Sequence, residues 1–573
     1  MKKITLLLFT FLITNQLYSQ SLFNRIWGNS GNILTQIRIA TAKPNTDELY
    51  VNYETDHFGS IYVYNNNTGT HNLFYQLPQS TPPQGTGSAF RFENMVFDSN
   101  NNLIVYGRTH NANLGTANTY SPIPFPYTSF TGHTFIAKIS PEKKLVWITY
   151  FHDLVQSRNN LAIDKNNNIY VLNYRHKNDV LSPSYFKSKG DSSSNRTYQE
   201  VISKISPNGQ HLWSTFYFND ESEINSIVAS DDGLFVYGVY LGSNPSNTYF
   251  STTNSYQETP SNSGSSEKSV IFLTKLGFDG KRSWGTYFGT DIIRIPINYT
   301  SFPQSLIAIG KDAYFLATHT SVNSQTNNIT TPNCYLNSAP DPTKNTILTK
   351  FNGDGKRDWT TYLYAGQALQ KNEQNELVVT ASIYETNPNI LNLTTLDAYQ
   401  PIHGGKTDIY TSILSNNGKT LKYGSFYGFA GEDNGVVINS KNGFYIHGKS
   451  DANSNSISPF STTNQVLFGS SGNYWGYISG FFIQKSLSLN ENYKLNINIY
   501  PNPTTDILNI LSEENLPVTT VFTIYDISAK KVLTQKAQSI NTNQINVSNL
   551  NSGVYILEIN NNKVKQSIKF IKK

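Results

Sequence analysis

One strand–turn–strand block recurs along the middle of the chain, and this repeat restricts the fold more than any other sequence feature. The first clear copy, Phe135–Trp147, reads FIAKISPEKKLVW, and later copies keep the apolar strand, a short polar turn and an aromatic residue in the next strand. Asn-Gly and Asp-Gly turns between alternating apolar runs are typical of β-hairpins. The aromatic anchors are spaced by 66, 71, 75 and 64 residues, and they are Trp147, Trp213, Trp284, Trp359 and Tyr423.

A second block lies between these hairpins and consists of a polar, Asn- or Asp-rich turn followed by an apolar strand. Asp98–Tyr106 and Asp164–Val171 are clear examples among seven copies, and Ile61–Phe74 is a degenerate first copy of the aromatic hairpin. Each unit therefore holds two hairpins, which is four strands. Seven four-stranded units predict an all-β chain whose main domain, residues 21–486, is a seven-bladed β-propeller.

The two ends of this repeat region indicate how a propeller would close. The last unit runs from about Asp433 to Gln484 and lacks an aromatic fourth strand, and Phe23–Gly28 near the start of the chain looks like that missing strand. We therefore expect the N-terminal strand to complete the last blade. The aromatic anchors are interpreted as packing between blades, because aromatic side chains dominate core burial.

Composition agrees with a turn-rich β-protein and excludes other classes. The chain has 573 residues, of which 38% are apolar, 13% aromatic and 14% charged, and its mean hydropathy of −0.40 excludes a polytopic membrane protein. The formal charge of +5 comes from lysines at the two ends, so a nucleic-acid footprint has no support. Cys334 is the one cysteine, which excludes an internal disulfide and a CxxC site, and it is interpreted as a loop or packing residue.

Residues 1–20 have the pattern of a secretory signal peptide. Lys2 and Lys3 precede an apolar run, Ile4–Ile13, which is followed by polar residues and the small Ser19. The run is too short for a stable membrane anchor, and no later segment approaches 18 consecutive apolar residues. We expect the mature chain to leave the cytoplasm without a transmembrane segment.

The last 79 residues, 495–573, form a separate unit after a linker at 487–494. Short alternating strands such as Leu495–Tyr500 and Gly553–Ile559 predict a small β-sandwich over residues 495–573. The unit resembles the type A sorting domain of the type IX secretion system of Bacteroidota. The residues that carry this resemblance are Tyr500, Pro501, Asn502, Pro503, Asp506, Gly553, Tyr555, Lys569, Lys572 and Lys573. It implies recognition by the type IX machinery, passage through the periplasm, and a destination on the outer-membrane surface or outside the cell.

The repeats also resemble the SBBP β-propeller repeat family over roughly residues 22–486. The resemblance is carried by the Lys-Ile-Ser-Pro-Asn-Gly type of turn, by strands such as Gly285–Gly289, and by Ala398-Tyr399-Gln400. It implies a propeller and no particular activity or cofactor.

Long connections gather on one predicted face of this propeller. In six of the seven units the connection between the second and third strands is long, at 111–133, 178–199, 242–269, 321–345, 385–408 and 451–473. In a four-stranded meander these connections share a face with those that enter the next blade, and we call it the long-loop face. Function concentrates on loops that a rigid scaffold positions. The candidate ligand-contacting aromatics there are Phe125, Tyr127, Phe130, Tyr185, Phe186, Tyr249 and Phe250. The alternative, which the sequence favours, is that these rings attach the loops to the scaffold.

The sequence contains no evident catalytic residue, metal ligand set or cofactor motif. HExxH, GxSxG and the phosphate-binding P-loop pattern do not occur. The sequence therefore predicts an exported binding or adhesion module for a polysaccharide or a surface protein. One alternative is a carbohydrate-active enzyme whose acids come together from different blades, and another is a structural component of a surface coat.

Overall fold

The computed structural model describes most of the chain. The described residues are 23–32, 37–53, 56, 58–78, 90–125, 132–151, 154–155, 160–183, 186–242, 244–260, 269–289, 293–294, 304–320, 329–341, 344–387, 390, 393–450, 475–483, 497–512, 516, 520–528, 530–539, 542–560 and 565–573. The predicted signal peptide and linker lie outside them. The chain forms two compact units, Met1–Ile483 and Gln484–Lys573.

The first unit is built from antiparallel sheets of four or five strands, and seven of them occur in its described residues. We call them blades 1 to 7 in chain order. Blades 1 to 4 comprise β2(Ile37–Ala42), β3(Leu49–Tyr53), β4(Ser60–Tyr64), β5(His71–Gln76); β6(Phe90–Phe97), β7(Leu103–Thr109), β8(His133–Ile139), β9(Leu145–Phe151); β10(Leu154–Val155), β11(Leu161–Ile163), β12(Ile169–His176), β13(Tyr198–Ile205), β14(His211–Phe216); β15(Ser222–Ala229), β16(Leu234–Tyr240), β17(Val270–Leu276) and β18(Arg282–Phe288). Blades 5 to 7 comprise β19(Ile293–Arg294), β20(Leu306–Ile309), β21(Asp312–Thr320), β22(Lys344–Phe351), β23(Arg357–Leu363); β24(Ala368–Lys371), β25(Leu377–Tyr384), β26(Thr407–Leu414), β27(Leu421–Tyr427); β28(Asp433–Asn439), β29(Gly443–Ser450), β30(Trp475–Ile483) and β1(Phe23–Asn32).

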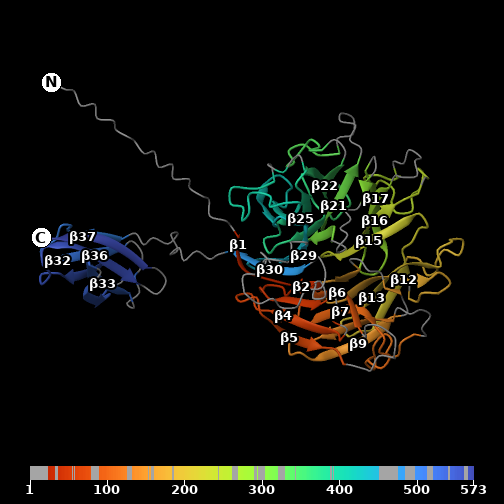
Figure 1. The fold of residues 1–573 in the computed structure, drawn as a ribbon, viewed down its shortest axis with the longest axis horizontal. Helices are drawn as coiled ribbons and strands as arrows, with labels where there is room; N and C mark the ends of the chain where they lie inside the picture. Colours follow the sequence, from red (N-terminus) through yellow and green to blue (C-terminus); the bar gives the residue numbers. More distant parts are fainter. Residues whose placement is uncertain are drawn as a thin grey trace, which may run out of the picture. The chain divides into compact units, whose positions relative to one another are not determined.

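The blades close into a ring through their innermost strands. β2 lies beside β6, β6 beside β11, β11 beside β15, β15 beside β20, β20 beside β24, β24 beside β28, and β28 again beside β2. Figure 1 shows the sheets following one another around the unit in colour order. This is the propeller arrangement that the repeat predicts, and the all-β fold class is confirmed.

The last blade is completed by the N-terminal strand, as the sequence predicts. β1 pairs antiparallel with β30, from Phe23 opposite Ile483 to Asn32 opposite Trp475 (Figure 1). Asp47 in blade 1 adds a second closing contact, because its carboxylate accepts hydrogen bonds from Ser440 Oγ at 2.9 Å and from the Asn442 backbone N–H at 2.8 Å in blade 7. The two ends of the repeat region are thus joined both within a sheet and between sheets.

The aromatic anchors lie between blades, which agrees with their predicted packing role. Each Trp ring lies against a glycine in the hairpin turn of the next blade, and these glycines have positive φ. The pairs are Trp147 with Gly209, Trp213 with Gly280, Trp284 with Gly355 and Trp359 with Gly418. Tyr423 replaces Trp where the next blade takes its fourth strand from the N-terminus, and its ring packs edge-on against Phe23 at 5.1 Å between centroids.

The long connections lie partly against the outermost strands, which sequence reasoning does not predict. In blade 2, Thr116 donates its backbone N–H to the Ile148 carbonyl at 2.8 Å and accepts from the Ile148 N–H with its Oγ1 at 3.1 Å. Blades 4, 5 and 6 repeat this pairing through Thr252, Thr331 and Thr395. The loop segments therefore cover hydrogen-bonding groups of the outer strands that an open edge would expose.

The second unit contains two antiparallel sheets that share one hydrophobic core. One sheet has the order β31(Ile497–Tyr500), β32(Ile507–Ser512), β35(Thr542–Asn546), and the other has β34(Lys531–Lys536), β33(Val521–Asp526), β36(Gly553–Asn560), β37(Lys565–Lys572). Leu508 and Ile545 from the first sheet pack with Phe522, Leu557 and Phe570 from the second. The two-sheet arrangement is the one expected of a small sandwich.

Candidate functional site: the long-loop face and its inner rim

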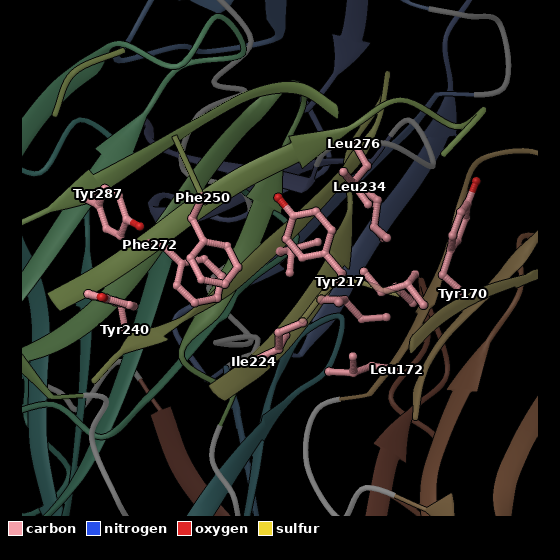
Figure 2. Packing of buried hydrophobic residues seen from close by; sticks show 14 of the residues in the cluster. Tyr170, Leu172, Tyr217, Ile224, Leu234, Tyr240, Phe250, Phe272, Leu276 and Tyr287 are labelled. Atoms are coloured by element: carbon pink, nitrogen blue, oxygen red, sulfur yellow. The ribbon is translucent and has the colours of Figure 1, made fainter. Parts of the chain in front are cut away.

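The structure distributes the predicted ligand-contacting aromatics between the core and the loops. Phe250 is completely buried, and its ring stacks on Phe272 with 3.7 Å between centroids and 3° between planes (Figure 2). Phe250 is therefore corrected from a surface residue to a core residue, because a ring without exposure has no face for a ligand. Phe186 and Tyr249 are half-buried and pack against the same cluster, which lies between blades 3 and 4.

The other predicted aromatic residues do not form a shared surface within the described residues. Phe125 is half-buried beside Tyr120, with 6.4 Å between ring centroids, whereas Tyr127, Phe130 and Tyr185 lie outside the described residues. The structure therefore does not bring the seven rings together as one binding patch within the residues it describes. The described rings anchor their loops, which matches the alternative that the sequence favoured.

Polar side chains converge instead at the inner rim of the long-loop face, in blades 1 and 2. Arg38 lies near the start of β2, Arg91 and Glu93 lie near the start of β6, and Arg108 lies near the end of β7. β2 and β6 belong to the innermost strands. These residues stand at the strand ends on the long-loop face, where the connections between blades enter β2 and β6 and where the 111–133 connection leaves β7. We call Arg38, Arg91, Arg108 and Glu93 the arginine cluster.

All three guanidinium groups of the arginine cluster bind the carboxylate of Glu93. Arg38 Nη2 lies 2.7 Å from Glu93 Oε2, Arg108 Nη2 lies 2.9 Å from Oε1, and Arg91 Nε lies 3.2 Å from Oε1. The Glu93 side chain is 4% exposed, against 13% for Arg38, 24% for Arg108 and 50% for Arg91. The buried carboxylate therefore orients guanidinium groups that extend toward solvent.

The strand register explains why the sequence does not predict that the side chains of the arginine cluster meet. β2 has a register shift between Ile37 and Ile39, and β6 has one between Phe92 and Asn94, so Arg38 and Glu93 each occupy a bulge. A bulge redirects a side chain that regular alternation would place elsewhere. Arg38 Nε also donates to the Phe92 carbonyl at 2.6 Å, which joins the two bulges across blades 1 and 2.

Two histidines adjoin the arginine cluster on the same blade. Burial, and then the positive charge of Arg108, lower the pKa of His110. Burial, and then His110, lower the pKa of His133 at the start of β8. Both rings are therefore neutral at neutral pH, and the charge of this region comes from the arginines.

A buried pair of acids lies between blades 6 and 7, on the long-loop side. Asp408 follows the start of β26 and Asp433 begins β28, and both are 0% exposed. Asp408 Oδ2 accepts from the Gly404 N–H at 2.8 Å and from Gln400 Nε2 at 3.0 Å. Burial raises the pKa of Asp408 to about 6, and the Asp433 charge adds to this. These bonds hold the connection that leads into β26, which gives the pair a structural role.

The part of the chain that the structure describes shows no further candidate site when it is searched for metal-binding groups, for membrane-spanning helices and around the lone cysteine. No group of three or more His, Cys, Asp or Glu side chains there is arranged to hold a metal ion. No described helix is long and apolar enough to cross a membrane. Cys334 is half-buried, and its Sγ lies 3.3 Å from the Leu336 carbonyl.

Comparison with solved structures gives weak likenesses. An aldose sugar dehydrogenase from Streptomyces coelicolor in its PQQ-bound form is 9% identical, covering 52% of this chain and 92% of that chain at a TM-score of 0.20. A chimera of ACO and RPE65 is 8% identical, covering 76% of this chain and 84% of that chain at a TM-score of 0.27. No curated protein matches the sequence.

Comparison with family models identifies the C-terminal unit. Residues 498–573 match the secretion system C-terminal sorting domain, and they include the resembling motif residues from Tyr500 to Lys573. Tyr500 is 48% exposed, whereas Tyr555 lies in the core beside Phe570 at 5.7 Å between ring centroids. The Asn502 side chain accepts from the Ile571 N–H at 2.9 Å, which ties the Pro-Asn-Pro segment to β37. The chain therefore carries at residues 498–573 a sorting domain of the type IX secretion system, which implies export to the cell surface or beyond.

Proposed function

We propose that the first unit is a binding or adhesion module that the sorting domain delivers to the cell exterior, where its long-loop face takes a polysaccharide or a surface protein. Residues 1–20 act as the signal peptide for the first step of this export. As part of the same proposal, the repeats are members of the SBBP β-propeller repeat family.

The observation that carries the proposal is the rigid attachment of the long connections. Four connections make the paired threonine bonds with their outer strands, at 2.8 to 3.0 Å for the backbone N–H. Gln257 and Gln400 add a further attachment, since each side chain accepts from a glycine N–H at 3.1 Å beyond the outer strand, at Gly289 and Gly428. The described loop segments held in this way present a preformed surface, which lowers the entropy cost of binding a ligand.

The test is binding of the purified mature chain to insoluble polysaccharides and to isolated cell envelopes, with released reducing sugar measured in the same incubation. We expect saturable binding without sugar release. Binding to no polysaccharide and no envelope would contradict the proposal. The matched variants are Thr252→Val, which removes a loop attachment, and Thr534→Val in β34 of the sorting domain.

A second candidate function rests on the Asp408–Asp433 pair. Two carboxyl groups near each other are the usual machinery of glycoside hydrolysis. Under this alternative the incubation releases sugar, and Asp433→Asn abolishes the release. The hydrogen bonds that Asp408 makes to its own loop favour the structural use of the pair, so the binding module is the preferred proposal.

A further inference from the structure

The arginine cluster has more positive charge than the carboxylate of Glu93 neutralises. Three guanidinium groups surround one carboxylate, which leaves a formal charge of +2 among these four side chains. Arg91 and Arg108 also stand directly opposite each other on β6 and β7. Like charges at directly opposed positions of a sheet are destabilising. Because this repulsion between Arg91 and Arg108 is retained at an exposed rim, we infer that the two positive charges have a use beyond folding.

Donors of the cluster remain available after Glu93 is satisfied. A guanidinium group has five N–H donors in a planar fork. Arg108 Nε is buried and has no hydrogen-bond partner among the described residues, while the Arg91 side chain is 50% exposed. Arg91 uses its Nε for Glu93, so the terminal nitrogens of its fork lie farther along an exposed side chain. The cluster thus combines orienting bonds to Glu93 with the remaining donors of the Arg91 fork, which lie on an exposed side chain.

We propose that the arginine cluster binds the anionic groups, carboxylate or sulfate, of an acidic polysaccharide. This assigns a ligand class to the binding module and rests on that proposed function. Arg91 makes the direct contact with the anion, and Arg108 supports it from the neighbouring strand. Glu93 and Arg38 are positioning residues that hold the two forks in place.

The chemistry suits this ligand because carboxylate and sulfate oxygens match the spacing of guanidinium N–H groups. Such charge-assisted bonds are frequently bidentate and are about twice as strong as neutral ones. Arginine is preferred to lysine for this purpose, since its planar fork is preorganised. Glu93 restricts rotation of the Arg91 side chain through the Nε bond, which reduces the entropy lost when the anion binds.

The choice of a polysaccharide over an acidic protein follows from the destination and from the site. The sorting domain implies delivery to the cell surface or beyond, where acidic polysaccharides present a charged group on successive sugars. The cluster consists of four side chains from β2, β6 and β7, whereas a standard protein interface needs about 800 Å² from each partner. A polymer chain can reach such a rim with one or a few anionic groups.

The experiment measures binding of the full mature chain to immobilised polymers at low salt and at about 0.5 M salt, where exposed charges are strongly screened. Alginate presents carboxylates, dextran sulfate presents sulfates, dextran is neutral, and polyglutamate represents an acidic protein. The test variant is Arg91→Glu. The matched control is Lys281→Glu, which makes the same charge change at a side chain that is 68% exposed in the hairpin turn of blade 4.

We expect alginate or dextran sulfate to bind at low salt and to weaken at high salt. Arg91→Glu should weaken this binding by about tenfold or more, the effect of one lost charge-assisted contact, while Lys281→Glu changes it by less than about twofold. Arg91→Lys, which keeps the charge without the fork, should fall between wild type and Arg91→Glu. Thermal unfolding of each variant checks that the propeller remains folded. Preference for alginate or for dextran sulfate separates the two anionic groups, and either preference supports the proposal.

Four results would overturn the inference. Equal binding by Arg91→Glu and Lys281→Glu would show that the cluster is not the anion site. Tighter binding of polyglutamate than of both acidic polysaccharides would show that the ligand of the cluster is an acidic protein and not a polysaccharide. Binding of neutral dextran or envelopes that Arg91→Glu leaves unchanged would refute the inference while the binding module stands, whereas binding to nothing would refute both.

Discussion

The indole Nε1–H of Trp147 in blade 2 donates to the carbonyl oxygen of Pro207 in blade 3 at 3.0 Å. Trp213 and Trp284 repeat this bond toward Phe278 and Gly353, at 3.1 and 2.9 Å. The lysine of the same hairpin donates to the same carbonyl, as Lys204 does to Phe278 at 2.9 Å. Each of these blades is therefore fastened to the hairpin turn of the next, which gives the recurring Lys, Trp and Gly of the repeat a shared structural role.

The turn glycines should be sensitive to substitution in proportion to their contact with the indole. Gly355 has φ of 81°, and a Cβ there would lie 2.7 Å from Trp284 Cδ2. Gly310 has φ of 61°, but the nearest atom to its Cβ would be 3.8 Å away. We expect Gly310→Ala to cost about 1 kcal/mol from backbone strain and Gly355→Ala to cost about 3 kcal/mol because overpacking is added. Thermal unfolding measures both, and equal losses would contradict the prediction.

Closure of the ring should depend on Asp47. Its carboxylate accepts from Ser440 Oγ, from the Asn442 N–H, and from Asn442 Nδ2 at 2.6 Å. We expect Asp47→Ala to destabilise the first unit by about 2–4 kcal/mol, since three part-buried donors lose a charged acceptor. Asp279→Ala is the control, because that side chain is 58% exposed and its loss should cost about 0.5 kcal/mol or less. Similar unfolding temperatures for the two variants would argue against a closing role.

The Asp408 carboxyl should make stability depend on pH. Its pKa is raised from 3.8 to about 6, chiefly by burial, so the folded chain holds this proton more tightly than the unfolded chain. The resulting stabilisation is complete below about pH 3.8 and is lost as the pH rises through about 6. We expect Asp408→Asn to remove this dependence and to gain stability relative to wild type above pH 6, by about 3 kcal/mol.

The measurement is the unfolding temperature of wild type and Asp408→Asn from about pH 4 to pH 8. Asp279→Asn serves as the comparison for loss of an exposed acid. The prediction fails if the difference between wild type and Asp408→Asn stays constant across this range.

Export should depend on the folded sorting domain. Phe570 in β37 is 0% exposed within the core, whereas its neighbour Ile571 is 41% exposed. We expect Phe570→Ala to destabilise the domain by about 3–5 kcal/mol and to leave the protein in the periplasm, while Ile571→Ala is exported normally. Cell fractionation with detection of the chain measures this, and normal export of a destabilised Phe570→Ala would refute the dependence.

Local sequence patterns were sufficient for much of the fold. Hairpin turns, strand alternation and recurring aromatic anchors predicted the repeated four-stranded units and the completion of blade 7 by β1, because turn chemistry and side-chain alternation act over a few residues. The Pro-Asn-Pro segment and the final strands indicated the sorting domain. Export to the cell exterior follows from the same residues.

The candidate site depended on contacts that local patterns do not contain. Phe250 is a candidate for ligand contact by sequence, yet its ring is buried and stacks on Phe272. The threonine bonds that draw the loops along the outer strands join residues about 30 positions apart.

The sequence by itself determined the strands, their grouping into repeats and the C-terminal address, since these follow from short-range periodicity. The tertiary structure alone decided which side chains meet. Arg38 and Glu93 lie 55 positions apart, and two bulges together with the packing of β2 beside β6 bring them within 2.7 Å. Such convergence depends on register and blade packing, which involve the whole ring and not the pattern of any one strand.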